Sequence, residues 1–118
     1  MTAYYWLPTA ALLFVSACAT TSSPSAKAED SSAAIRAAEE VGATHSPDSA
    51  LYLQLAKEEF EHARLMNKDK DREASDRLLL RAQTDAELSL ALARSETEKA
   101  EAGAAIEKVK TLKQSATQ

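Results

Sequence analysis

The sequence predicts an all-α protein, folded as a long antiparallel helical hairpin or as a three-helix bundle. Its composition is biased toward Ala, Glu, Lys, Leu and Arg, which is typical of long helices. The 118 residues include only two glycines and three prolines, and the β-branched residues that favour strands are few. Apolar residues also recur at intervals of three and four, as the buried face of a helix requires.

The amino-terminal segment 1–17 has the pattern of a secretory signal peptide. Its apolar run from Leu7 to Ala17 matches the roughly 7–15 residues of a signal core and is shorter than the ~20 residues that span a membrane. Segment 1–6 carries no Lys or Arg, unlike the usual positive start of a signal. We expect cleavage after this segment. An uncleaved interfacial anchor and a fortuitous apolar start are the alternatives.

The signal segment ends in Val15-Ser16-Ala17, directly before Cys18, the only cysteine. This motif resembles the lipobox of bacterial lipoproteins. The resemblance implies cleavage before Cys18, a diacylglycerol on its thiol and an N-acyl chain on the new amino terminus, which together anchor a protein stably. Ala19, rather than Asp, follows the cysteine, and the resemblance then implies the periplasmic face of the outer membrane. The other interpretation is a free or disulfide-bonded thiol, although one cysteine allows no internal disulfide.

The segment 18–31 connects this cysteine to the rest of the chain. It begins with a run rich in Ser and Thr and lacks periodic apolar residues, so we expect a flexible tether. A helical domain is then expected over 32–114, followed by a disordered tail at 115–118.

Two shorter helices are expected first in this domain. The first covers 32–41, where apolar residues have helical spacing, and Gly42 follows as a natural stop. The second has the clearest start signal in the chain, because Ser46 can cap free backbone N–H groups and Pro47 suits the first helical position. We expect the second helix to end near Asn67.

The third helix is expected to run without proline from Asp71 to Lys113, about 65 Å. The short polar connection before it predicts that it packs antiparallel to the second helix. The second helix is only about half as long, so the far half of the third, with its stripe at 106–112, needs another partner. We expect the first helix there, in line with the second. A homodimer contact is the rival explanation.

Several stretches between Ala33 and Leu112 carry a family resemblance. They are Ala34 to Ala43, Ser46-Pro47, Leu53 to Lys57 and Leu80 to Leu88. With these stretches the chain resembles the domain-of-unknown-function family 4398. The resemblance implies an envelope lipoprotein or secreted protein with alanine-rich helices, and it implies no activity.

Composition and motifs argue against several functions. The net charge of −4 gives no broad basic field, so we expect no nucleic-acid binding. No phosphate-binding loop or nucleophile elbow occurs, and we expect no catalytic residues, no enzyme activity and no cofactor. Glu59 and His62 have the Glu-x-x-His spacing of di-metal bundles, but such sites need further ligands, so no metal is expected. Basic residues near the hairpin tip alternate with acidic ones and predict a mixed, solvated tip, and contact with anionic lipid headgroups or polymer is the alternative. They are Lys68, Lys70, Arg72, Arg77 and Arg81.

These observations together predict a non-catalytic lipoprotein that acts as a periplasmic spacer, scaffold or adaptor through helix–helix contacts. The expected partners are the membrane, an envelope protein and, as an alternative, a second copy in a coiled-coil oligomer. The side chains expected to contact a partner are Leu88, Leu92, Ile106, Val109 and Leu112. Alternative functions are a peptidoglycan-binding envelope-integrity protein and, less favoured, a metal-binding or enzymatic helical bundle.

Overall fold

The computed structural model describes residues 24–66 and 71–117, and within these ranges the chain is helical with short turns and no strand. The elements are α1 (Pro24–Glu40), the single 3₁₀ turn η1 (Ala43–His45), α2 (Pro47–Met66) and α3 (Arg72–Ser115). The all-α prediction is therefore confirmed. None of the described helices is long and apolar enough to cross a membrane.

The first helix begins at Pro24, eight residues before the start expected at residue 32. The tether expected over 18–31 is wrong over its second half, because α1 occupies it. Proline suits the first turn of a helix, and the inward side chain of this part is Ser31, which is fully buried. A search for large apolar residues therefore misses it.

The chain reverses direction between α1 and α2. Gly42, the predicted stop, has a left-handed φ of 78°, and its N–H donates to the Glu39 carbonyl at 3.0 Å. A side chain could not replace its hydrogen there, because an added Cβ would lie 2.5 Å from His45 Nδ1. The turn η1 completes the reversal, so α1 and α2 lie alongside α3 rather than end to end.

The start of α2 and the hairpin with α3 agree with the sequence prediction. Ser46 Oγ accepts from the Ser49 N–H at 3.4 Å, and Pro47 is the first helical residue. Asp71 caps the next helix by accepting from the Ala74 N–H at 3.3 Å. The polar segment before Asp71 includes 67–70, which lie outside the described residues.

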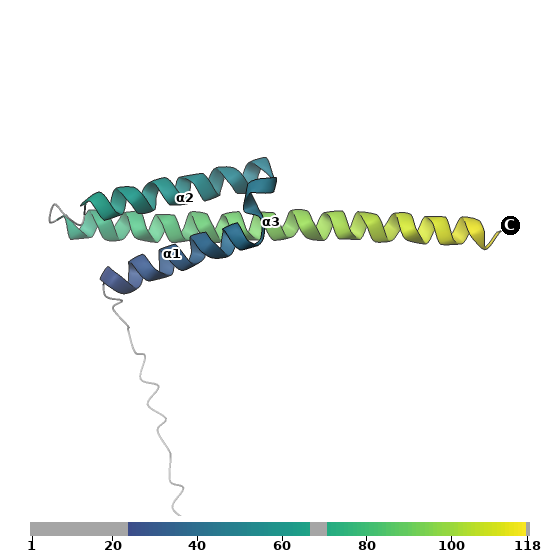
Figure 1. The fold of residues 1–118 in the computed structure, drawn as a ribbon, viewed down its shortest axis with the longest axis horizontal. Coiled ribbons are helices and arrows are strands. Elements are labelled where there is room, and N and C mark those ends of the chain that lie inside the picture. The colour runs from purple at the N-terminus through teal and green to yellow at the C-terminus, as the bar shows by residue number, and fades with distance from the viewer. Residues whose placement is uncertain (1–23, 67–70, 118) are drawn as a thin grey trace, which may run out of the picture.

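Both shorter helices pack on the amino-terminal half of α3, and α3 continues alone to the carboxyl end (Figure 1). The expectation that α1 covers the 106–112 stripe, in line with α2, is wrong. The reason is the reversal at Gly42, which returns the chain along the half of α3 that α1 already contacts. Every residue from 96 to 117 is exposed.

The core is made mainly of alanine and serine. Ile35, Leu53 and Leu79 are the only large apolar side chains among the described buried residues. Four serines are also buried, and each donates to a main-chain carbonyl outside its own turn of helix. The bonds are Ser31 to Leu79 at 2.7 Å, Ser75 to Ala63 at 2.9 Å, Ser89 to Ser49 at 2.7 Å and Ser49 to Ala43 at 2.6 Å. Small side chains let the helices approach closely enough for these bonds to form.

Candidate interaction surface

Helix α3 has a buried seam over its first half. The buried positions alternate at spacings of four and three residues, the repeat of helices that pack side by side. We call them the inner seam: Ser75, Leu79, Ala82, Ala86, Ser89 and Ala93. Helices α1 and α2 cover this seam, and the last member, Ala93, lies near the turn between them. The inner seam therefore holds the body together.

A second row with the same spacing follows the opposite face of α3. Its members are small or apolar except for Glu98. We call them the outer seam: Thr84, Leu88, Ala91, Ser95, Glu98, Ala102, Ala105, Val109 and Leu112. At 100° per residue, Val109 lies roughly 160° around the helix axis from Ala93. The stripe at 106–112 is therefore no continuation of the inner seam, and a helix bound to the inner seam leaves it uncovered.

The outer seam is exposed to solvent along its whole length apart from the half-buried Ser95. The exposed fraction is 40% for Leu88, 50% for Val109 and 59% for Leu112. A shallow groove in the isolated half of α3 is lined by Ala105, Ile106, Val109, Lys110 and Lys113. Exposed apolar side chains that recur along one face of a helix are characteristic of a surface that binds another helix.

The side chains expected to contact a partner fall into two groups. Leu88, Val109 and Leu112 belong to the outer seam, and Ile106, 57% exposed, borders it. Leu92 differs, because it is half-buried on the flank of α3. The sequence prediction missed the small members of the seam, such as Ala102 and Ala105. Their spacing of four and three with Val109 and Leu112 was the signal that could have identified them.

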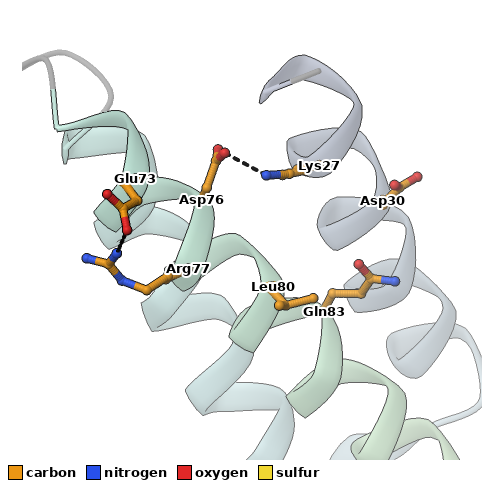
Figure 2. A pocket seen from close by; sticks show the side chains of 7 residues that line it. All are labelled: Lys27, Asp30, Glu73, Asp76, Arg77, Leu80 and Gln83. Carbon is orange, nitrogen blue, oxygen red and sulfur yellow. Dashed lines mark hydrogen bonds and ion pairs between the residues drawn. The ribbon is translucent and has the colours of Figure 1, made fainter. Parts of the chain in front are cut away.

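A hollow between α1 and α3 collects charged side chains, and Figure 2 shows how they lie. Lys27 Nζ meets Asp76 Oδ2 at 2.6 Å across the two helices, and Arg77 bonds Glu73 at 2.7 Å. The hollow is lined by Lys27, Asp30, Glu73, Asp76, Arg77, Leu80 and Gln83. Because its lysine and arginine already have acidic partners, this hollow is better explained as a contact that fixes α1 on α3.

Two of the described basic residues predicted near the hairpin tip are also paired with acids. Arg81 pairs with Glu59 at 2.6 Å, and Arg77 with Glu73. Lys68 and Lys70 lie outside the described residues. The described part of the tip is therefore mixed in charge, as the sequence predicts.

Glu59 is the one described residue with a buried polar side-chain atom that lacks a hydrogen-bond partner, its Oε2. Burial raises the pKa of this carboxyl, Arg81 opposes the rise, and the neighbouring Asp85 carboxyl adds to it. His62 is exposed and lines a different surface hollow. No group of three or more His, Cys, Asp or Glu that could hold a metal ion occurs in the described ranges.

The lipobox residues Val15, Ser16, Ala17 and Cys18 lie outside the described residues. Comparison of the chain with family models, with curated proteins and with solved structures finds no match. The resemblance to the domain-of-unknown-function family 4398 therefore stays a prediction.

Proposed function

We propose that the chain is a non-catalytic lipoprotein of the bacterial envelope, which acts as a spacer, scaffold or adaptor through helix–helix contacts. In this proposal acylated Cys18 anchors it at the periplasmic face of the outer membrane, and the outer seam of α3 binds a protein partner.

The observation that carries the proposal is the isolated half of α3. Large exposed apolar side chains are costly in water unless something covers them, and Ile106, Val109 and Leu112 are all at least half exposed. The same half contributes nothing to the core of the body. A rigid helix of 44 residues, about 66 Å long, can carry this contact away from the packed end.

The anchor is tested by the intact mass and membrane fractionation of the native protein beside Cys18→Ala. We expect a mature chain that begins at a doubly or triply acylated cysteine, and a variant that leaves the membrane fraction. A native chain that keeps Met1 or carries a free thiol at Cys18 contradicts the anchor.

The contact is tested by capture of crosslinked partners from the same cells. We expect native protein and Val109→Glu to reach the membrane equally, while only the native protein retains its crosslinked partner. A pull-down with purified peptidoglycan separates the scaffold role from direct cell-wall binding, because a scaffold that acts through apolar helix contacts does not need the polymer.

A further inference from the structure

The charges on the isolated half of α3 are distributed so that two antiparallel copies of this half bring opposite charges together. Segment 96–101 has three acidic residues and one lysine, whereas segment 107–113 has three lysines and one acidic residue. When two copies of this helix lie antiparallel, the acidic segment of each faces the basic segment of the other. A parallel pair would place like charges together, which is unfavourable.

We propose that a second copy of the chain covers the outer seam from Ser95 to Leu112, paired antiparallel about a twofold axis near Gly103 and Ala104. This inference rests on the proposed scaffold role and names the partner of the same surface. The contact is isologous, because the same patch of each copy binds the other, and it therefore closes as a dimer.

The seam positions meet favourably in this register. Ala102 of each copy faces Ala105 of the other, so the two backbones approach closely near the axis. Ser95 faces Leu112, which matches a small residue with a large one. Each of these positions is partly or fully exposed in the single chain.

The flanking charges meet with opposite sign. Glu101 of each copy lies beside Lys108 of the other, and this pair occurs twice. Neither residue takes part in an ion pair within the described parts of the chain, whereas Lys99 and Lys110 bond Glu96 and Glu107 of their own helix. Glu98, the one charged member of the seam, faces Val109 and reaches the lysines that border it.

The two bodies do not obstruct this pairing. The overlap uses residues 95–112 of each copy, of which 96–112 are exposed and Ser95 is half-buried, and each body continues outward from its own end. The start of α1 lies beside the start of α3, as the Lys27–Asp76 pair shows. At 1.5 Å per residue, the amino-terminal ends of the two bodies are about 80 Å apart. The dimer would therefore be a long rod with one lipid anchor near each end.

Cysteine crosslinking in the full chain tests the orientation. Two differently tagged copies are expressed together, one with Glu98→Cys and the other with Val109→Cys, beside a chain with no added cysteine. We expect a crosslink between positions 98 and 109. Two cysteines at 98, or two at 109, lie roughly 16 Å apart in this register and should not join. Crosslinks between identical positions, or none above the control, would overturn the proposal.

A charge exchange tests the same contact without altering the fold, because both residues are exposed. We expect Glu101→Lys and Lys108→Glu each to reduce the crosslinked fraction several-fold. The double variant Glu101→Lys with Lys108→Glu should restore it, because each copy again offers opposite charges. Failure of the double variant to recover the crosslink would contradict the antiparallel register.

The outcomes separate this inference from the function on which it rests. If position 109 crosslinks only to a different envelope protein, the dimer is wrong and the scaffold role stands. If positions 98 and 109 crosslink in a chain that carries no acyl group, the dimer stands and the lipid anchor is wrong.

Discussion

At the residue scale, this body is stabilised by close approach rather than by large side chains. Alanine buries little apolar surface, so each core position contributes modestly. Three of the four buried serines add hydrogen bonds between helices, each with a net contribution of about 1 kcal/mol. Ser89 is fully buried where α2 and α3 meet, and it donates to the Ser49 carbonyl at 2.7 Å. The fold therefore depends on the smallness of these residues.

Enlargement of a buried serine should lower the stability of the fold far more than enlargement of an exposed small residue on the outer seam. We expect Ser89→Leu to lower the free energy of unfolding by about 1–3 kcal/mol, because the helices must move apart to admit it. The control Ala91→Leu, at an exposed position of the outer seam, should change it by less than about 0.5 kcal/mol. Urea unfolding measures both. Equal losses would mean that the two seams are equally packed.

Glu59 should make stability depend on pH. Burial raises the pKa of Glu59 despite Arg81, so the folded protein holds this proton more tightly than the unfolded chain. Its contribution to stability is therefore fully present below the ordinary glutamate range and is lost as pH rises through the folded-state value. We expect Glu59→Gln, relative to the parent, to gain stability in urea unfolding as the pH rises above the ordinary glutamate range. The exposed residue variant Glu61→Gln is the control. If stability depends on pH identically in all three proteins, the raised pKa of Glu59 is contradicted.

At the element scale, the sequence predicts some features well because one residue type determines them. The cap at Ser46, the turn at Gly42 and the long proline-free α3 follow from local backbone chemistry. The start of α1 could not be predicted, because its buried position, Ser31, is indistinguishable from a tether serine. The sequence also predicts the wrong half of α3 for the packing of α1, since the sequence alone does not show that η1 reverses the chain.

The predicted contact residues also divide into those that the sequence identifies and one that only the structure distinguishes. Large residues such as Val109 and Leu112 mark the outer seam in the sequence. Leu92 is also a large apolar residue and borders the same seam, but it is half-buried, and only the position of the other helices distinguishes it.

Substitution by alanine should change stability in opposite directions at the two glycines, Gly42 and Gly103. Gly103 lies within α3 with nothing near its added Cβ, so Gly103→Ala should stabilise the helix by up to about 1 kcal/mol. Gly42→Ala should destabilise the protein, because φ is 78° and His45 occupies the space. Hydrogen exchange across α3 and thermal unfolding measure the two effects. A gain in stability from Gly42→Ala would contradict the turn described above.

At the scale of the whole molecule, α3 divides the chain into a packed body and an isolated helix. The inner seam holds the body, and the outer seam faces away from it. The lipid anchor proposed at Cys18 would hold the body at a membrane, while α3 carries the contact surface beyond it. Stability and interaction then depend on opposite faces of one helix.

Removal of the isolated part should therefore leave the body intact. Residues 103–117 are exposed throughout, so a chain that ends at Ala102 should unfold within about 0.5 kcal/mol of the full chain. The same chain should lose its partner. Thermal unfolding and partner capture measure the two properties, and a large loss of stability would show that the isolated helix contributes to the body.

The most direct test of the central claim is photo-crosslinking from the outer face of α3 in cells. A photoreactive residue at Val109 should give a specific crosslinked product in the membrane fraction. The same residue at Thr111, two positions along and also exposed, lies roughly 160° around the helix axis and should give none. Equal products from both positions, or none from Val109, would contradict the claim that the outer seam is the interaction surface.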